Sequence, residues 1–156
     1  MPRILGKIKL RLLVVGEFYG DENIYRKQLA DLGLAKNVSV YSEYVPNEDV
    51  GKYFSASDVI VLPYVSATQS GIVQIAYQFD KPVIATDVGG LAEVVLDKKT
   101  GFIVPPENPN ALTDAVVRFY KEKREPKFRA NIMREKKNYS WSVLVKGIEQ
   151  LVELGK

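Results

Sequence analysis

The 156-residue chain contains neither cysteine nor histidine. Without cysteine it has no disulfide, no thiolate nucleophile and no cysteine-based metal site. The absence of histidine removes the commonest general base and the commonest transition-metal ligand, so a Ser-His-Asp triad is excluded. Any chemistry in this chain therefore depends on carboxylates, lysine, arginine, tyrosine, hydroxyl groups and backbone dipoles.

Long hydrophobic runs and a strong net charge are also missing. No apolar run approaches the ~20 residues that a membrane span needs, and the first residues lack the apolar core of a signal peptide. We therefore expect a cytoplasmic protein. The net charge of +3 is typical of a solvated surface, and no basic stripe with interleaved aromatic residues indicates nucleic-acid binding. With 46% hydrophobic residues, the chain can form one domain with a substantial core.

Short apolar segments alternate with amphipathic ones, which predicts a single α/β domain over residues 1–156. The expected strands are Lys9–Val15, Val38–Tyr41, Val59–Leu62, Val83–Ala85 and Phe102–Val104. The expected helices run from Asp21 or Glu22 to Leu32, over Glu48–Ala56, over Ser70–Phe79, after Gly90, after Asn108, and over Phe128–Lys137 and Val143–Leu154. This order is typical of a parallel sheet with helices on both faces.

Several details of these helices are also predicted. Three helices are expected to be capped by side chains, the first by Asp21 or Glu22 and the others by Asn47 and Asn108. The inner side of the first long helix should carry Ile24, Leu29 and Leu32. Residues 121–156 form the carboxyl-terminal helices, with Ser140 or Ser142 as a cap and Trp141 packed against the last one.

The stretch Ser57–Thr86 reads as strand, polar loop, helix and strand, and the rest of the chain is arranged around it. Free N–H groups at the start of its helix, with the hydroxyls of Thr68 and Ser70, form a candidate anion site. An ordinary capped helix explains the same residues equally well. Neither a GxxxxGK[ST] loop nor a GxGxxG motif is present.

Two further segments also have both a functional and a purely structural explanation. Asp87-Val88-Gly89-Gly90 could lie near a ligand, but a strand-to-helix turn with positive φ is the simpler explanation. Glu17, Phe18 and Tyr19 follow the first strand and could frame a ligand at the same sheet edge. Packing of the two rings on a neighbouring loop accounts for them equally well.

Taken together, the motifs LLVVGEFYG, FSASDVIVLPYVSATQSG, KPVIATDVGGLAEVV and TGFIVPP resemble glycosyltransferases of the GT-B fold. The resemblance spans about Leu12 to Trp141 and is specific in order and spacing. It is greatest to the retaining, nucleotide-sugar-dependent enzymes related to glycogen and sucrose synthases. In that family such a segment makes up most of the carboxyl-terminal Rossmann-like domain, which binds the donor.

The resemblance implies roles for individual residues. Tyr44 and Val45 would lie near the nucleotide base, and Gly16 and Glu17 would border the cleft. The backbone of Thr68, Gln69, Ser70, Gly71 and Ile72 would lie at the diphosphate. The implied ligand is a nucleotide-diphosphate sugar acting as donor substrate, with no cofactor, no metal site and no catalytic residue in this chain.

The sequence also departs from the family pattern. Many members carry two glutamates on the central loop and helix, at the positions of Ala67 and Ile75 here. The family's domain begins with an earlier strand and helix that carry an Arg and a Lys-Gly facing the phosphates. The resemblance implies that this sequence starts after them, and Lys7 and Lys9 do not match their positions. The amino-terminal acceptor domain is likewise expected to be absent. Without that Arg and Lys-Gly, only backbone dipoles and hydroxyls remain to neutralise the leaving diphosphate, and a half-cleft cannot position the acceptor, so we expect the isolated chain to be inactive. The alternative is a non-catalytic Rossmann-like interaction module.

The resemblance also implies which partners the chain has. They are a nucleotide sugar and the missing acceptor domain; any contact with a membrane surface would come only through the parent enzyme, and nucleic acid is not expected. The loops that would face the missing domain carry Phe18, Tyr19, Tyr44 and Tyr64. We expect the isolated domain to self-associate through these rings.

Overall fold

The computed structural model describes residues 1–139 and 141–154, and the strands of this part of the chain form two parallel sheets. In the first sheet β1 (Leu12–Val15) pairs with β2 (Val38–Tyr41). In the second, β4 (Val83–Thr86) lies between β3 (Ile60–Leu62) and β5 (Gly101–Val104). The α/β class with parallel strands is thus confirmed, although the strands form two separate ladders.

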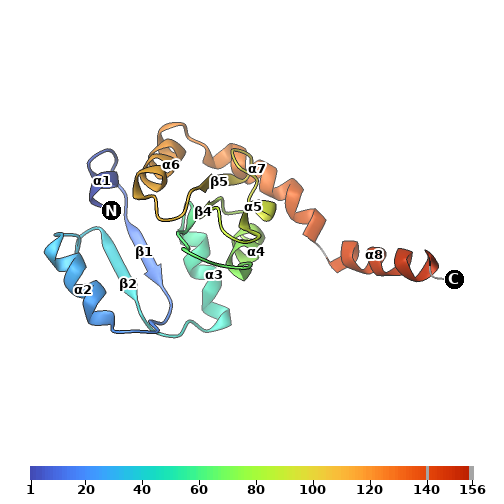
Figure 1. Cartoon of the computed structure of the whole chain (residues 1–156), viewed down its shortest axis with the longest axis horizontal. Helices are drawn as coiled ribbons and strands as arrows, with labels where there is room; N and C mark the ends of the chain where they lie inside the picture. The colour runs from blue at the N-terminus through green and yellow to red at the C-terminus, as the bar shows by residue number, and fades with distance from the viewer. Residues whose placement is uncertain (140, 155–156) are drawn as a thin grey trace.

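Helices connect the strands and cover them (Figure 1). Two of the expected side-chain caps are present: Asp21 accepts a hydrogen bond from the Asn23 N–H, and Asn108 accepts one from the Ala111 N–H. The helices of the described residues are α1 (Pro2–Leu5), α2 (Glu22–Asp31), α3 (Asn47–Ala56), α4 (Gly71–Gln78), α5 (Leu91–Val94), α6 (Pro109–Lys121), α7 (Glu125–Glu135), the 3₁₀ helix η1 (Lys136–Tyr139) and α8 (Trp141–Leu154).

Some details differ from the sequence-based expectation. Asn47 is the first residue of α3, and its predicted role as cap is wrong because Pro46 holds the cap position without a side-chain hydrogen bond. Ile24 and Leu32 are 64% and 49% exposed, so their predicted inward orientation is also wrong. Helix α7 begins before Phe128, since Pro126 is tolerated in a first helical turn.

Two expectations near the carboxyl end lie outside what the structure describes. Ser140 and the side chain of Trp141 do not belong to the described part of the chain. Ser142 lies within α8. The short helix α1 was not expected.

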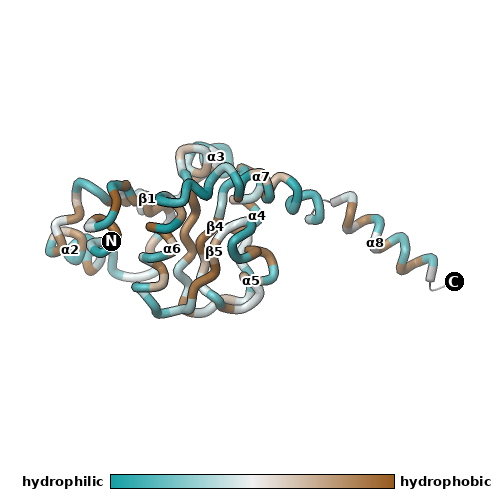
Figure 2. Tube along the Cα trace, turned by 90° about the horizontal axis from the view of Figure 1, so that it is seen from above, coloured by the Kyte–Doolittle hydropathy of each residue, from teal (hydrophilic) through white to brown (hydrophobic). Residues whose placement is uncertain are grey.

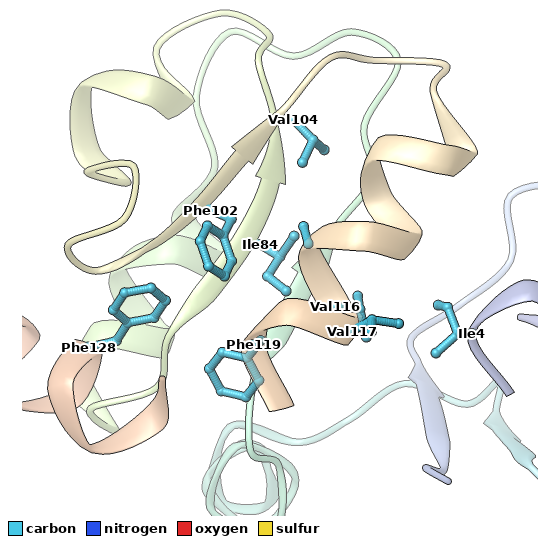
Figure 3. Close-up of a cluster of buried hydrophobic side chains, with 9 residues drawn as sticks. Ile4, Ile84, Phe102, Val104, Val116, Val117, Phe119 and Phe128 are labelled. Carbon is cyan, nitrogen blue, oxygen red and sulfur yellow. The ribbon is translucent and has the colours of Figure 1, made fainter. Parts of the chain in front are cut away.

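The three-stranded sheet carries the core because both of its faces are covered. Successive residues of a strand point to opposite faces. Ile84 of β4 packs with Phe102, Phe119 and Phe128 on one face, where α1, α6 and α7 contribute (Figure 3). Val83 packs on the opposite face, whose cluster also contains residues of α4, α5 and α7. All four residues of β4 are buried, and helices on both faces of this sheet are therefore confirmed.

The start of β5 lies very close to the backbone of β4. Gly101 begins β5, and a Cβ atom at this position would lie 1.7 Å from the Val83 carbonyl oxygen. Nearby, the buried Tyr77 hydroxyl donates to Thr100 Oγ1 at 2.6 Å, and Thr100 Oγ1 accepts from the Leu96 N–H at 2.9 Å. These contacts tie α4 to the turn before β5.

The two-stranded sheet is packed less well. Helices α2 and α3 have no buried residue. The Leu12 N–H donates to the Asn37 carbonyl oxygen just before β2, and the Gly16 N–H donates to that of Tyr41. The N–H groups of Leu13 and Val15 therefore point away from β2. No strand of the described residues pairs with that edge of β1, nor with the outer edge of β3.

The last helix leaves the body of the molecule. Figure 1 shows α8 projecting away from the sheets. Figure 2 shows hydrophobic residues concentrated along β4 and β5 and recurring along α8, where Val145, Ile148 and Leu151 are about half exposed or more. Within residues 1–139 and 141–154, no helix is long and apolar enough to cross a membrane.

Tyr77 is expected to link stability to pH. Burial raises the pKa of Tyr77 to about 12, above its ordinary value of 10.0. Its contribution to the free energy of unfolding is therefore intact below pH 10 and is lost between pH 10 and 12. Tyr77→Phe should cost about 1–2 kcal/mol at pH 8, because the bond to Thr100 is removed, and should reduce the alkaline loss. Urea unfolding at pH 8 and 11 measures both effects, and equal losses for the two proteins at pH 11 would contradict this assignment.

Candidate functional site

The start of α4 presents unsatisfied backbone donors at the carboxyl end of the three-stranded sheet. The first N–H groups of a helix have no acceptor within the helix, and the Ser70 side chain does not cap those of α4. Gly71 and Ile72, the first two residues of α4, are exposed. Together with the helix dipole, these donors favour an anion at this position.

The loop before α4 is held in place from β4. The buried Thr86 hydroxyl donates to the Tyr64 carbonyl oxygen at 2.6 Å, just after β3 ends. At the other end of the loop, the Tyr64 hydroxyl lies 3.3 Å from Ser70 Oγ. Thr86 and Tyr64 therefore position the loop through contacts that the sequence analysis did not predict.

The turn between β4 and α5 contacts the same loop. The Gly90 N–H donates to the Thr68 carbonyl oxygen at 2.7 Å. Gly89 has a φ of +52°, and a Cβ atom there would lie 2.1 Å from the Ala67 carbonyl oxygen. The expected positive-φ turn is thus confirmed, and the second loop also turns out to be packed against the first.

The remaining predicted site residues lie on the other sheet. Gly16 and Glu17 follow β1, where the Gly16 N–H donates to the Tyr41 carbonyl oxygen at 3.0 Å. Tyr44, which is 68% exposed, and Val45 lie between β2 and α3. Among the described residues, no hydrogen bond or ring contact joins these four residues to Thr68–Ile72.

The aromatic residues after β1 have different environments. The ring of Phe18 packs on that of Tyr25, with centroids 5.2 Å apart. Tyr19 is fully exposed. Packing is thus seen for Phe18 alone, and its partner lies on helix α2 and not on a loop. Self-association through Tyr19 and Tyr44 stays a prediction.

A cavity of about 510 Å³ lies between α4, α5 and η1. Its polar lining comes from Gln69, Ser70, Gln74, Glu93 and Tyr139. Sequence reasoning missed Glu93, although the residue belongs to the turn motif that it did single out. It also missed Tyr139, for which the sequence holds no evident signal because this contact joins segments far apart in the chain.

The site contains little positive charge of its own. No lysine or arginine lines the cavity, and within the described residues no cluster of acidic side chains could hold a metal ion. An anion at the start of α4 would therefore be held by backbone N–H groups and hydroxyls. The geometry defines a Rossmann-like half-domain, and the loop at the carboxyl end of its sheet is a candidate anion site.

Comparison with known sequences identifies the family. The profile described as glycosyl transferases group 1 matches residues 1–122, and the chain belongs to this family. An uncharacterized glycosyltransferase of Methanocaldococcus jannaschii is 29% identical over 152 residues, which cover 94% of this chain and 37% of the relative. The chain thus spans little more than a third of the length of that relative.

Comparison with solved structures agrees on a GT-B carboxyl-terminal half-domain. Sucrose-phosphate synthase from Thermosynechococcus elongatus superimposes with a TM-score of 0.78 at 24% identity, over 92% of this chain and 38% of the other. Anabaena HepE in complex with UDP-glucose superimposes with a TM-score of 0.78 at 17% identity, over 96% of this chain and 43% of HepE. The carboxyl-terminal domain of LpcC from Francisella tularensis superimposes with a TM-score of 0.74 at 19% identity, over 84% of this chain and 70% of that domain.

Substitution of the two adjacent glycines should separate their roles. Gly89→Ala is expected to cost about 1–3 kcal/mol because it forces positive φ on alanine and drives a methyl group into the Ala67 carbonyl. Gly90→Ala is the matched control, since its methyl group would meet only ordinary contacts of 3.4–3.6 Å. Thermal unfolding of both variants measures the difference, and equal melting temperatures would contradict the close contact between the two loops.

Proposed function

We propose that this chain is the donor-binding part of a glycosyltransferase that uses a nucleotide-diphosphate sugar. The observation that carries the proposal is the uncapped start of α4, whose loop is held by both Thr86 and Gly90. Membership of the family supports this proposal. So does the likeness of fold to HepE, a protein whose structure contains UDP-glucose.

The proposal assigns the diphosphate to the backbone of Thr68–Ile72. Exposed N–H groups bind charged oxygens without needing a lysine or arginine, and hydrogen bonds to charged groups are stronger than those to neutral ones. Tyr44 and Val45 would then contact the nucleotide base, and Gly16 and Glu17 would line the edge of the cleft. The two sheets would contribute to one ligand.

Transfer of the sugar would require a second part of the enzyme. The departing diphosphate must be neutralised in the transition state, and the acceptor must be held in line with the sugar. The start of α4 offers partial charges only, and in this proposal the acceptor is positioned by another part of the enzyme. The active enzyme would consist of this half-domain and a partner half that supplies the acceptor site.

A non-catalytic interaction module is the second candidate. It is favoured by Ala67 and Ile75, which stand where the resemblance leads us to expect carboxylates. Such a module would keep the Rossmann-like fold and would not bind the donor. Nucleotide binding separates the two candidates.

Gly71 offers a direct test of nucleotide binding. Gly71→Pro removes one N–H from the first position of α4, where proline is tolerated, and Ser70 before it is already extended. Gly71→Ala keeps the N–H, and its methyl group would meet nothing within 4 Å. Calorimetry with UDP and GDP should show millimolar or tighter binding of one of them, unchanged in the alanine variant and about tenfold weaker in the proline variant.

Two results would count against this assignment. Silence with both nucleotides would favour the interaction module. Equal affinities of the proline and alanine variants would show that the N–H of Gly71 does not hold the phosphates. Circular dichroism of the two variants establishes that the helical content is unchanged.

The isolated chain should show no acceptor-dependent turnover. An assay with UDP-glucose, UDP-N-acetylglucosamine and GDP-mannose, each with monosaccharide and inositol acceptors, measures nucleotide release. We expect the release to equal that of a sample without acceptor. Turnover above that level in any pair would contradict the proposed need for a partner half.

A further inference from the structure

The positive charge of the chain is concentrated in one short segment near its carboxyl end. Residues 121–139, which span the last residue of α6, all of α7 and η1, contain eight lysines and arginines and three glutamates, a net charge of +5. The whole chain carries +3, so the rest of it sums to −2. The excess of basic residues therefore belongs to this segment and is not spread over the surface.

One face of α7 and η1 is exposed and carries only basic and apolar side chains. Phe128 and Ile132 turn the opposite face of α7 into the core. Glu125 and Glu135 lie three residues before and after this buried pair, so they flank the core side, and both are only partly exposed. The exposed side chains, which recur at helical spacing, are those of Lys127, Arg129, Ala130, Met133, Arg134 and Lys137. We call these six residues the basic face.

The four cations of the basic face have no acidic partner within the described residues. The carboxylates that lie nearest in the sequence and in space are bound by other cations. Glu122 contacts Arg118 and Arg124, and Asp80 contacts Lys136. An exposed cluster of one sign with no compensating charge attracts an oppositely charged surface, and added salt screens that attraction.

Helix α8, which follows η1, presents an apolar stripe without a partner. Val145, Ile148, Leu151 and Val152 are three or four residues apart, so they share one side of the helix. All four are about half exposed or more, and Figure 1 shows that α8 projects away from the sheets. The charged side chains of α8 lie on its other side: Lys146, Glu149 and Glu153. Amphipathic helices of this kind lie in the plane of a membrane surface.

The two features together indicate the kind of partner. A nucleic acid would contact the lysines and arginines, but it would stack its bases on aromatic rings and leave the aliphatic stripe in water. A bilayer with anionic lipids offers negatively charged headgroups to the basic face and an apolar layer to the stripe. The bilayer is therefore the partner that uses both features.

We propose that α7, η1 and α8 form a surface that docks this chain on a bilayer containing anionic lipids. The basic face lies on the headgroups, and the stripe of α8 enters the boundary with the acyl chains. A membrane contact is thereby placed on this chain, whereas the sequence led us to expect one only through the parent enzyme. The proposal is independent of nucleotide binding, because none of these residues belongs to the start of α4.

Removal of charge tests the electrostatic part of the proposal. The chain is sedimented with vesicles of equal parts phosphatidylcholine and phosphatidylglycerol, and with vesicles of phosphatidylcholine alone. Lys127→Gln with Lys137→Gln should weaken binding to the anionic vesicles about tenfold or more, because each basic residue near the surface contributes roughly fivefold. Lys27→Gln with Lys36→Gln removes the same charge at exposed positions elsewhere and should change binding less than about twofold.

Removal of apolar surface tests the part played by α8. Ile148→Gln with Leu151→Gln should weaken binding to the anionic vesicles about tenfold, since the buried methylene groups are lost. The matched control is Ile24→Gln with Leu32→Gln, at positions that are 64% and 49% exposed, and it should leave the affinity unchanged. Circular dichroism of all four double variants shows that the helical content is retained.

The outcomes distinguish this surface from its alternatives. Loss of binding in the α7–η1 and α8 variants, with both controls unaffected, supports the proposal. Absence of binding to anionic vesicles overturns it, as does equal binding to both kinds of vesicle or an equal loss in variants and controls. Binding of single-stranded RNA that needs Lys127 and Lys137, without binding of vesicles, overturns it in favour of nucleic acid. None of these results changes the proposed donor site, which nucleotide calorimetry tests separately.

Discussion

The candidate site depends on one contact between two loops, the hydrogen bond from the Gly90 N–H to the Thr68 carbonyl. The loop after β3 is polar and exposed and has little packing of its own. The turn after β4 fixes it, and Gly89 approaches it more closely than any residue with a side chain could. β4 is the most buried strand of the second sheet, and the loop before α4 is bonded to Thr86 of this strand and to Gly90 after it. A loop that is fixed before binding pays a smaller ordering cost when a ligand binds.

The two halves of the proposed site differ in how well they are packed. The three-stranded sheet, which carries the start of α4, is covered on both faces. The β1–β2 pair, which carries Glu17 and Tyr44, is covered by helices without a buried residue. Within the described residues, the outer edges of β1 and β3 have no neighbouring strand, so their backbone groups lack a sheet partner.

The sequence predicts features that depend on neighbouring residues alone, such as short strands and helix caps. Val38–Tyr41 was predicted with the bounds that the structure shows, and Asn108 caps α6 because an Asn side chain satisfies a free N–H whatever lies around it. The cap predicted at Asn47 is wrong by one position, because Pro46 occupies the cap position and Asn47 is already the first residue of α3. Ile24 points to solvent, although its spacing fits an inner face, because no layer lies there to bury it. The sequence motif contains Glu93, but its position near Gln69 at Gly90 depends on how two loops pack and could not be predicted.

The central claim is that the backbone at the start of α4 holds a nucleoside diphosphate. The most direct measurement is an ¹⁵N-edited NMR titration of the chain with UDP and GDP, which follows each backbone amide separately. We expect the amide resonances of Gln69–Ile72 to shift first and furthest with one of the two nucleotides. The resonance of Gly90 should follow, because its N–H is bonded to that loop. Shifts confined to other parts of the molecule, or no shifts at millimolar nucleotide, would contradict it.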